Sequence, residues 1–593
     1  MNVLKRGSDQ DNWWQAYPGL YARELAAYEG HGASHRPLIQ QDGTLILEVL
    51  WPMDSGGSIR LNVGYSPLHP FCRPSISAPE LQLERHQNPF TRDLCLLTQD
   101  SAQWYPHQMV ADFVAERLSQ VLQVMTLRRN EKWSEAASLE EQAPDPVTPY
   151  HMHVAEEYSA VFFDGQQPVP NAPLGTAVFL LQDRLERGRS PPFQAILSKV
   201  EPLSGTWMAK PFDLPKRAGP WKNVIGRWIR LEPPFPEAPE EILAAAEKAI
   251  ERQSALFPAH LRKLGSIADD DLSITAVVFQ EELSYGPDNK GNGWFFLVSR
   301  RVPGSRRRQV SLVRGYRLSS DMLSRLPVAS ALKSKKVVLV GCGAIGSFAA
   351  VELARSGVGQ LTIIDFDLVE PGNTVRWALG RSVWGLPKTT ALHDFLYHNY
   401  PWTNVGRGHA KVGSAISNVD DVRKLEGNPM RWLRALIEDA DIVVDTSAAT
   451  ECQGALAYMC RSIGKPYVLG HATEGAAGGV VARFKPGAPG CYVCLQQHWS
   501  GKTLPLPTID SSGTIVPTGC NAPTFTGGAF DLQEVSMEVV RSTIGLLAPD
   551  VYDSGDWHLS ILDLTENGRR ILPRWKAETI APHSSCSCGA SQG

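Results

Sequence analysis

The chain has 593 residues, of which 43% are hydrophobic and 20% are charged, so it can build several cores, in three or four domains. Its 58 basic and 62 acidic residues give a net charge of -4, too near neutral to indicate nucleic acid or an acidic membrane surface as the partner. No apolar segment opens the chain or is long enough to span a bilayer, so we expect a cytoplasmic protein whose ten cysteines serve metal binding or thiol chemistry.

The first 130 residues predict an α+β domain. Apolar residues recur at helical spacing through residues 11–30, and two strand-like runs, 45–50 and 59–63, follow with an Asp-Ser-Gly-Gly turn signal between them. A proline-rich passage then leads to a second helix, expected at about residues 106–127. The order helix, antiparallel strands, irregular loop and helix is typical of a small α+β fold.

The middle of the chain carries no recognisable chemistry. Residues 130–150 are charged and then proline-rich, which predicts a linker. Residues 151–325 mix strand-like runs with prolines and contain one helix, expected at about residues 240–264. We interpret residues 151–325 as a mixed connecting domain.

Strands and helices alternate from Lys335 onward, in a predicted C-terminal domain of residues 326–593. A helix is expected at residues 347–355, ended by Gly357. The predicted strands are 337–340, 361–365, 441–445 and 465–470. This alternation is typical of a doubly wound parallel sheet.

A glycine-rich turn joins the first of these strands to the helix. Gly341, Gly343 and Gly346 form a G-x-G-x-x-G pattern in the strand–turn–helix context that gives the pattern meaning. The glycines let the backbone approach a phosphate, and the helix N-terminus offers unpaired N–H groups. Asp365 follows the second strand, where a carboxylate can hold ribose hydroxyls. Alone, these residues also fit a dehydrogenase.

Three polar or cationic residues, Asn373, Arg376 and Lys388, follow Asp365 closely. A dinucleotide oxidoreductase has no need for such a cluster at this point. Adenylation does need it, because negative charge builds on the α-phosphate and the pyrophosphate as a carboxylate attacks. Arginine can bind two phosphate oxygens at once, and lysine supplies a compact charge. The cluster therefore favours a nucleotide site that activates a carboxylate.

The run Asp365-Phe-Asp-Leu-Val-Glu-Pro-Gly-Asn-Thr-Val-Arg376, followed by Gly385-Leu-Pro-Lys388, resembles the ThiF/MoeB and ubiquitin-activating-enzyme superfamily. The resemblance implies a domain that uses ATP and Mg²⁺ to adenylate the C-terminal glycine of a ubiquitin-like protein. It also implies that Asp365 binds ribose and that Asn373, Arg376 and Lys388 contact the triphosphate.

The metal-binding carboxylate departs from the pattern of the superfamily. Many relatives carry a second aspartate shortly after the strand equivalent to residues 441–445, and that aspartate holds the metal. This chain reads Asp445-Thr-Ser-Ala-Ala449 at that point, so the second aspartate is missing. Asp445 or Asp367 is therefore expected to hold Mg²⁺ instead.

Two cysteine pairs in the C-terminal part have the spacing of a metal site. Cys491 and Cys494 form a C-x-x-C pair, and Cys586 and Cys588 form a tighter C-x-C pair. Four thiolates suit a tetrahedral structural Zn²⁺ site, which activating enzymes of this superfamily often have. Because the second pair is so close, His583 is an alternative fourth ligand, and unrelated surface thiols are the remaining alternative.

Cys520 lies in a segment rich in Gly, Pro and Thr, ahead of a helix expected at about residues 530–547. A structural cysteine usually lies in an apolar strand or helix, whereas a loop keeps a thiolate accessible for nucleophilic attack. In the superfamily a catalytic cysteine occupies a crossover loop at this stage, so the resemblance implies that Cys520 takes the activated tail as a thioester. The cysteines interpreted as packing residues are Cys342, Cys452 and Cys460.

A second reactive cysteine is predicted near the N-terminus. The order His86-Gln-Asn88, Cys95 and Trp104-Tyr-Pro106 resembles the ubiquitin-conjugating-enzyme fold, which has His-Pro-Asn shortly before its catalytic cysteine and Trp-x-Pro before the next helix. Gln87 replaces the proline here, and the spacing to the cysteine is slightly shorter. The amide of Asn88 can stabilise the oxyanion that forms when an amine attacks a thioester, or brace the loop. We expect a structural role for His86, and a noncatalytic scaffold is the alternative for the domain.

The whole chain, with a conjugating, a connecting and an activating domain, resembles the fused conjugating-and-activating enzymes of bacterial type II CBASS antiphage operons. The resemblance implies three steps: ATP activates a C-terminal glycine as an acyl-adenylate, Cys520 takes it as a thioester, and Cys95 receives it and delivers it to a target amine. It implies that the tail belongs to a cGAS/DncV-like nucleotidyltransferase and that the enzyme is a homodimer.

Three alternatives remain open at this point. The same chemistry could act on a ubiquitin-like modifier from a different bacterial operon. The chain could instead be a sulfur-carrier adenylyltransferase whose N-terminal domain only binds. A Rossmann oxidoreductase is the third alternative, and it requires the glycine pattern to hold a redox cofactor.

Overall fold

The computed structural model divides into two compact units, one of residues 1–212 with 220–318 and the other of residues 213–219 with 319–593. No helix among the described residues is both long enough and apolar enough to cross a bilayer. The structure describes residues 12–39, 44–53, 56–96, 104–139, 145–164, 169–182, 193–202, 221–252, 272–283, 290–301, 305, 307–318, 323, 325–413, 430–515 and 524–589.

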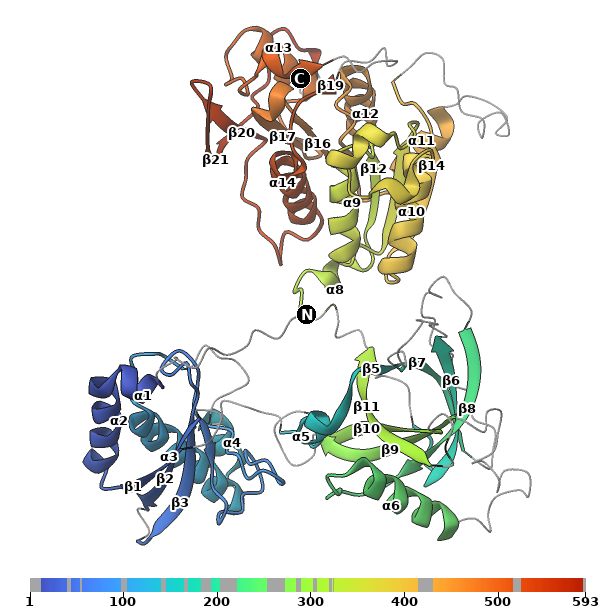
Figure 1. Ribbon diagram of the computed structural model, residues 1–593. Coiled ribbons are helices and arrows are strands. Elements are labelled where there is room, and N and C mark those ends of the chain that lie inside the picture. Colours follow the sequence, from blue (N-terminus) through green and yellow to red (C-terminus); the bar gives the residue numbers. More distant parts are fainter. Residues whose placement is uncertain are drawn as a thin grey trace. The chain divides into compact units, whose positions relative to one another are not determined.

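The N-terminal part of the first unit is an antiparallel sheet with helices before and after it (Figure 1, blue). The helices are α1 (Trp13–Ala16), α2 (Pro18–Gly30), α3 (Val110–Arg129) and α4 (Trp133–Leu139). The sheet order is β1-β2-β3-β4, with bounds Ser34–Ile39, Leu45–Pro52, Ser58–Tyr65 and Ser75–Ser77. Alternate residues of β2, from Leu45 to Trp51, are buried, because one face of the sheet covers the core. The order of elements agrees with the sequence-based prediction.

A buried carboxylate ties these elements together. Glu24, on α2, is fully buried. It accepts hydrogen bonds from the Tyr65 hydroxyl at 3.2 Å and from the backbone N–H of Val110 at 3.0 Å, and it lies 3.1 Å from Nε2 of His69. These partners belong to β3, to the start of α3 and to the loop after β3. Glu24 therefore fixes where that loop leaves the sheet.

The predicted linker at residues 130–150 is partly wrong. It contains α4, whose Ala136 is buried, and the start of α5 (Thr148–His151). The carbonyl of Leu139 accepts a hydrogen bond from Gln120 of α3. The charged composition of this stretch suggested a linker, but a helix that packs on its neighbour needs apolar residues on only one face and can be charged on the others.

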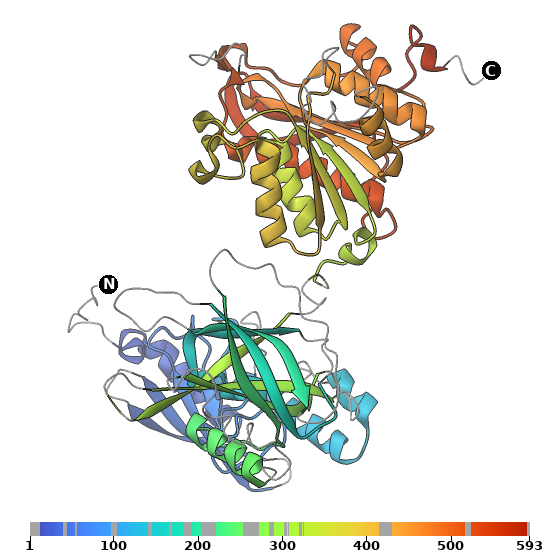
Figure 2. The same ribbon diagram turned by 90° about the vertical axis from the view of Figure 1, so that its right-hand side faces the viewer.

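The connecting region forms a closed barrel in the order β10-β11-β5-β7-β6-β8-β9, seen from the side in Figure 2 (teal to green). The strand bounds are β5 Ala155–Asp164, β6 Leu174–Gln182, β7 Gln194–Pro202, β8 Trp221–Arg230, β9 Leu272–Glu282, β10 Lys290–Arg301 and β11 Arg308–Leu318. One face of α6 (Pro239–Arg252), with Ile242, packs in a buried cluster with Phe279 and Phe295 of the barrel. The predicted helix at 240–264 matches α6 in its first half, and residues 253–264 lie outside the described residues.

The second unit contains an eight-stranded sheet in the order β14-β13-β12-β15-β16-β17-β20-β21. Strands β14 to β16 of this order are parallel, while β17, β20 and β21 continue it antiparallel, so the predicted parallel sheet is correct for only part of it. The bounds are β12 Lys336–Val340, β13 Gln360–Asp365, β14 Asn404–His409, β15 Ile442–Asp445, β16 Tyr467–Ala472, β17 Gly478–Phe484, β20 Leu559–Glu566 and β21 Arg569–Glu578.

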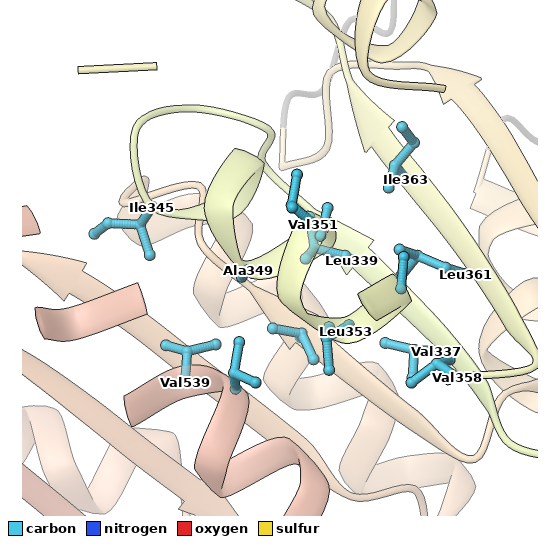
Figure 3. Close-up of a cluster of buried hydrophobic side chains, with 14 of the residues drawn as sticks. Val337, Leu339, Ile345, Ala349, Val351, Leu353, Val358, Leu361, Ile363 and Val539 are labelled. Atoms are coloured by element: carbon cyan, nitrogen blue, oxygen red, sulfur yellow. The ribbon is translucent and has the colours of Figure 1, made fainter. Parts of the chain in front are cut away.

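Helices cover both faces of this sheet (Figure 1). Val337 and Leu339 of β12 belong to the core with α9, α10 and α14, shown in Figure 3, while Val338 and Val340 belong to the core with α11, α12 and α13. A strand buried on both faces needs apolar residues at successive positions, which explains the run Val337-Val-Leu-Val340. The bounds are α8 Ala329–Leu332, α9 Gly346–Arg355, α10 Lys388–Asn399, α11 Met430–Asp439, α12 Thr450–Ile463, α13 Tyr492–Ser500 and α14 Ala529–Leu547.

Replacing Glu24 should destabilise the N-terminal domain strongly. Glu24→Ala is expected to lower the free energy of unfolding by about 3–5 kcal/mol, because it leaves buried donors without an acceptor. Urea denaturation followed by tryptophan fluorescence measures the change. Glu29→Ala is the matched control, since the Glu29 side chain is 70% exposed and its removal should cost less than about 0.5 kcal/mol. Equal costs for the two substitutions would contradict the role given to Glu24.

Candidate active sites

The three glycines of the turn after β12 have different physical roles. Gly341 has a φ of +89°, and a Cβ there would lie 2.5 Å from the backbone nitrogen of Ser447. A Cβ on Gly346 would lie 1.8 Å from the carbonyl oxygen of Gly341. Gly343 is different, because a Cβ there would meet nothing within 4 Å. Gly341 and Gly346 therefore serve the fold, while Gly343 borders open space.

That open space belongs to a cavity of about 210 Å³ at the carboxyl ends of β12 and β15. Its lining brings Gly343 together with the predicted Asn373, Arg376 and Lys388. Burial lowers the pKa of Arg376, but a guanidinium stays charged at neutral pH. The cavity lies where the chain turns from one half of a doubly wound sheet to the other, the usual ligand position in such folds. An amide and two cations beside an open backbone turn suit a polyanionic nucleotide.

Asp365 and Asp367 hold the residues around this cavity in place. Asp365, the last residue of β13, accepts hydrogen bonds from the backbone N–H of Cys342 at 2.6 Å and from that of Asp367 at 2.8 Å. Oδ2 of Asp367 is paired with Nζ of Lys388. The first carboxylate therefore fixes the glycine turn, and the second orients the lysine. Ribose binding by Asp365 stays a prediction.

Asp445, the last residue of β15, is fully buried. Its Oδ1 accepts from the backbone N–H of Ser447 at 2.9 Å, and its Oδ2 accepts from the Tyr467 hydroxyl at 2.8 Å. Burial raises the pKa of its carboxyl group. The side chain of Asp367, by contrast, is 45% exposed. Its two oxygens also have partners, the backbone N–H of Leu368 and Nζ of Lys388, so which of the two carboxylates holds Mg²⁺ stays a prediction.

Cys95 borders a second cavity, of about 390 Å³, in the first unit. Asn88 lines it from the same loop, and residues 73–76 line it from the approach to β4 and its first two residues. Asp145 and Tyr150 line it from the segment that leads into the barrel. Burial raises the pKa of the Cys95 thiol, and the charge of Asp145 raises it further, while a hydrogen bond with Tyr150 lowers it. This cysteine is thus a thiol at rest that faces an open cavity.

The loop before Cys95 brings together the three residues predicted from the sequence. The backbone N–H of Cys95 donates to the carbonyl oxygen of His86 at 2.7 Å. His86 is buried and has a φ of 57°, a left-handed conformation that is strained for a non-glycine residue and is often found at functional sites. Oδ1 of Asn88 accepts from the backbone N–H groups of Phe90 and Thr91, which fixes the orientation of the side-chain amide.

Cys520 lies outside the described residues, but both flanks of its segment are placed. β18 (Thr514–Ile515) and β19 (Thr524–Phe525) pair antiparallel, and the backbone N–H of Thr526 donates to the carbonyl of Gly513 at 2.6 Å. The backbone N–H of Asp510 donates to Glu474, at the start of a short helix that follows β16. Ala472, the last residue of β16, lines the cavity beside Gly343. The N-terminal flank of Cys520 is therefore anchored just beyond the carboxyl end of β16, whose last residue lines this cavity.

The four predicted zinc ligands form one cluster. Their Sγ atoms lie within 4.8 Å of one another, and three of the pairs are 3.2–3.8 Å apart. Tetrahedral Zn²⁺ with bonds of about 2.3 Å would place its sulfur ligands about 3.8 Å apart, so the cluster could hold this ion. His583, the alternative ligand, lies beside the cluster: its backbone N–H donates to Sγ of Cys494 at 3.3 Å, and its Nδ1 accepts from the backbone N–H of Ser585. The residues in the cluster are Cys491, Cys494, Cys586 and Cys588.

Sequence reasoning missed the residues that reach these cavities from distant segments. Asp145 and Tyr150 lie in a stretch that was predicted to be a linker, and no local motif marks them. Thr446 and Ser447 line the nucleotide cavity from the loop after β15, and no local pattern distinguishes their hydroxyls from those of other loop residues. Only the pairing of β15 with β12 could have pointed to them.

The fold and the cavity beside Gly343 define a nucleotide-binding doubly wound domain. Residues 321–547 match the ThiF family. The chain is also 30% identical, over 220 residues, to the molybdopterin-synthase adenylyltransferase of Escherichia coli, a match that covers 37% of this chain and 77% of that protein. The chain therefore belongs to the ThiF family. Its C-terminal domain is of the ATP-dependent adenylyltransferase type, which implies ATP and Mg²⁺ as cofactors. The family therefore speaks against the Rossmann oxidoreductase considered above.

Two further relatives differ in how much of the chain they match. A Sinorhizobium fredii protein, y4oA, is 99% identical over 593 residues, the whole of both chains. The ubiquitin-like modifier-activating enzyme 5 of Dictyostelium discoideum is 27% identical over 164 residues, which cover 28% of this chain and 42% of that enzyme. The second match makes part of this chain similar to an enzyme that activates a ubiquitin-like modifier.

Gly343→Ala should separate ligand binding from folding. We expect its melting temperature to stay close to that of the unsubstituted chain, and its affinity for ATP to fall by about tenfold or more, because the methyl group enters the cavity. Isothermal titration calorimetry with Mg-ATP measures the affinity. Gly341→Ala is the comparison variant and should lower the melting temperature instead, because it strains a left-handed residue. Unchanged ATP affinity in Gly343→Ala would contradict this placement of the nucleotide.

Proposed function

We propose that this chain activates the C-terminal glycine of a protein with ATP and Mg²⁺ and then ligates it to an amine of a target protein. The tail becomes an acyl-adenylate in the cavity beside Gly343, passes to Cys520 as a thioester and then moves to Cys95, from which the amine takes it. The main support for the relay is a cavity lined by both Cys95 and Asn88. This cavity lies in a domain that is far in sequence from the adenylation site.

The lining of the nucleotide cavity supports the first step. As a carboxylate attacks the α-phosphate, negative charge moves onto the departing pyrophosphate. Arg376 and Lys388 bring two cations to this point, and Asp367 holds the lysine in position. Adenylyl transfer is catalysed mainly by positioning of the reactants and by stabilisation of the negative charge in the transition state.

The placed flanks of Cys520 support the second step. Ile515 lies five residues before Cys520 and Thr524 four residues after it. An extended chain of that length spans at most about 18 Å. Asp510, on the N-terminal flank, is hydrogen-bonded to Glu474, which lies two residues after Ala472 in the cavity lining, and this supports a position of Cys520 near the adenylate. A tethered nucleophile also has a high effective concentration.

The N-terminal domain supports the third step. Its order of helix, four-stranded antiparallel sheet and helix, with a His–Asn–Cys loop between sheet and helix, is similar to the arrangement that the sequence resemblance implied. Asn88 lines the cavity with its amide oriented by the turn that follows it. An amide N–H₂ donor in this place can stabilise the oxyanion of the tetrahedral intermediate.

We further propose a cGAS/DncV-like nucleotidyltransferase of a bacterial CBASS operon as the protein whose tail is conjugated, with a homodimer as the working assembly. The support is the combination of an adenylation domain and a cysteine-bearing α+β domain on one chain. A ubiquitin-like modifier with a C-terminal glycine would use the same chemistry, so the choice of tail protein is tested separately from the relay.

Separate removal of the two cysteines tests the relay. The purified chain is incubated with Mg-ATP and a candidate tail protein, and hydroxylamine-sensitive adducts are followed by intact-mass spectrometry. Cys520→Ala should still exchange pyrophosphate with ATP but acylate neither cysteine. Cys95→Ala should accumulate the thioester on Cys520 and lose product by about a hundredfold or more. Cys72→Ser, at another partly exposed cysteine of the N-terminal domain, is the control and should behave as the unsubstituted chain.

Two outcomes would contradict the relay. If product formation survives Cys95→Ala, the N-terminal domain only binds, and the sulfur-carrier adenylyltransferase gains support. If adenylate forms while neither cysteine is ever acylated with either kind of tail protein, the thioester steps are wrong and only the adenylyltransferase activity stands.

We also infer that the cluster of four cysteines holds one structural Zn²⁺ ion. Metal analysis of the purified chain should then find about one zinc per chain, and Cys494→Ser should lose most of it and lower the melting temperature, because the ion joins α13 to the end of the chain. Cys72→Ser should keep the zinc. Full zinc content in Cys494→Ser would contradict the assignment.

A further inference from the structure

The segment that leads into the barrel places two polar side chains at Cys95. Asp145 and Tyr150 both line the Cys95 cavity. The Tyr150 hydroxyl donates its single proton to Oδ1 of Asp145 at 2.7 Å, so in its hydrogen bond with Cys95 the thiol is the donor. Sulfur, phenol and carboxylate thus form a continuous hydrogen-bonded chain inside one cavity.

The carboxylate of Asp145 is held from the Cys95 loop. Its Oδ2 accepts the backbone N–H of His86 at 2.9 Å, although the two residues are 59 positions apart in sequence. His86 also supplies the carbonyl that accepts the backbone N–H of Cys95. The same loop backbone therefore positions both the sulfur and the carboxylate.

The barrel holds the segment from the other side. The backbone N–H of Asp145 donates to Oε2 of Glu282 at 3.1 Å, and Glu282, at the end of β9, is also paired with Arg85 next to His86. Its neighbour Glu281 accepts from both the backbone N–H and the hydroxyl of Thr148, at 3.0 and 2.7 Å. The barrel thereby anchors the segment that carries Tyr150.

We propose that Tyr150 is a further catalytic residue at Cys95, which donates a proton to the sulfur as the acyl group leaves, and that Asp145 relays to it the proton released by the amine. The proposal rests on the proposed role of Cys95 as the last acyl carrier. It gives the barrel a part in the chemistry, because the barrel anchors the segment that carries the proton donor.

The step balances without another reactant. An amine nitrogen attacks the carbonyl carbon held on Sγ of Cys95, the C–N bond forms, and the C–S bond breaks with its electron pair on sulfur. The nitrogen gives one proton to Asp145, Asp145 passes a proton to Oη of Tyr150, and Tyr150 gives its own proton to Sγ. The products are an amide and a free thiol, and the carboxylate and the phenol return to their starting states.

The electrostatics explain why a proton donor is needed. Burial and Asp145 raise the pKa of the Cys95 thiol, so its thiolate is a poor leaving group unless it is protonated as it departs. Burial also raises the pKa of Tyr150 above its ordinary value, so the phenol keeps its proton at neutral pH. Tyr150 lines the same cavity as Cys95, and its single proton becomes available to the sulfur once Asp145 has taken the proton of the amine and no longer accepts from the phenol.

The discharge of a small acyl group tests the proposal on the full chain. p-Nitrophenyl acetate acetylates Cys95, methylamine serves as the acceptor, and peptide-resolved mass spectrometry follows the acetyl group on Cys95 alone. Tyr150→Phe should slow discharge by about a hundredfold, the scale of a general acid. Asp145→Asn should slow it also, since it keeps the shape but cannot pass on a proton. Tyr158→Phe, at a tyrosine that is 82% exposed, is the matched control and should leave the rate unchanged.

A second readout separates proton donation from a structural role. Alkylation of Cys95 by iodoacetamide leaves the sulfur bonded and needs no proton donor, so Tyr150→Phe should change it by less than about fivefold, the scale of one hydrogen bond. Discharge of Tyr150→Phe within about threefold of the unsubstituted rate would overturn the proposal. Equal slowing of discharge and alkylation would also overturn it, because it would mean that Tyr150 only shapes the cavity.

The acetyl probe needs neither ATP nor Cys520, so this experiment decides the role of Tyr150 even if the thioester relay fails. Conversely, acylation of Cys95 by the natural route with unimpaired discharge in Tyr150→Phe would uphold the relay and remove only this step. The two failures are therefore distinguishable.

Discussion

The adenylation domain depends on a close backbone contact in the turn from β12 into α9. The Cα of Gly346 approaches the carbonyl oxygen of Gly341 so closely that no side chain fits between them, and Gly341 itself takes a left-handed conformation. This contact lets α9 begin shortly after the strand, with its apolar side in the core of Figure 3 and the residues just before its first turn in the lining of the cavity. Asp365 closes the turn from β13 by accepting the N–H of Cys342. The nucleotide cavity therefore follows from backbone geometry, before any ligand is considered.

The Cys95 cavity depends on a different kind of constraint, a set of carboxylates that join distant segments. Asp145 connects the segment before the barrel with His86, and Glu282 connects the barrel with both Asp145 and Arg85. Buried or half-buried carboxylates are retained where they have several donors, because an unpaired charge in such a place is costly. In both cavities, carboxylates hold backbone or cationic groups in position, and this preorganisation is what catalysis by charge stabilisation requires.

Much of the nucleotide site could be predicted because its residues follow one another closely. Gly341 and Gly346 were expected to let the backbone approach a phosphate, and they prove to permit the turn itself, while only Gly343 borders the ligand space. Asp445 or Asp367 was expected to hold Mg²⁺, and Asp445 proves to accept hydrogen bonds from Ser447 and Tyr467, which no local pattern predicts. A strand-end carboxylate looks the same in sequence whether it faces a cavity or a core, because its partners come from other strands.

The sequence by itself determined the family of the C-terminal domain, the strand–glycine–helix turn and the four clustered cysteines, because each depends on spacing or backbone freedom within a short run of residues. Only the tertiary structure decided that the middle region closes into a barrel and that Asp145 and Tyr150 meet Cys95. Strand order and contacts across 59 positions depend on which surfaces pack together. Which surfaces pack together is decided by the burial of whole helix and sheet faces, and no short stretch of sequence encodes that by itself.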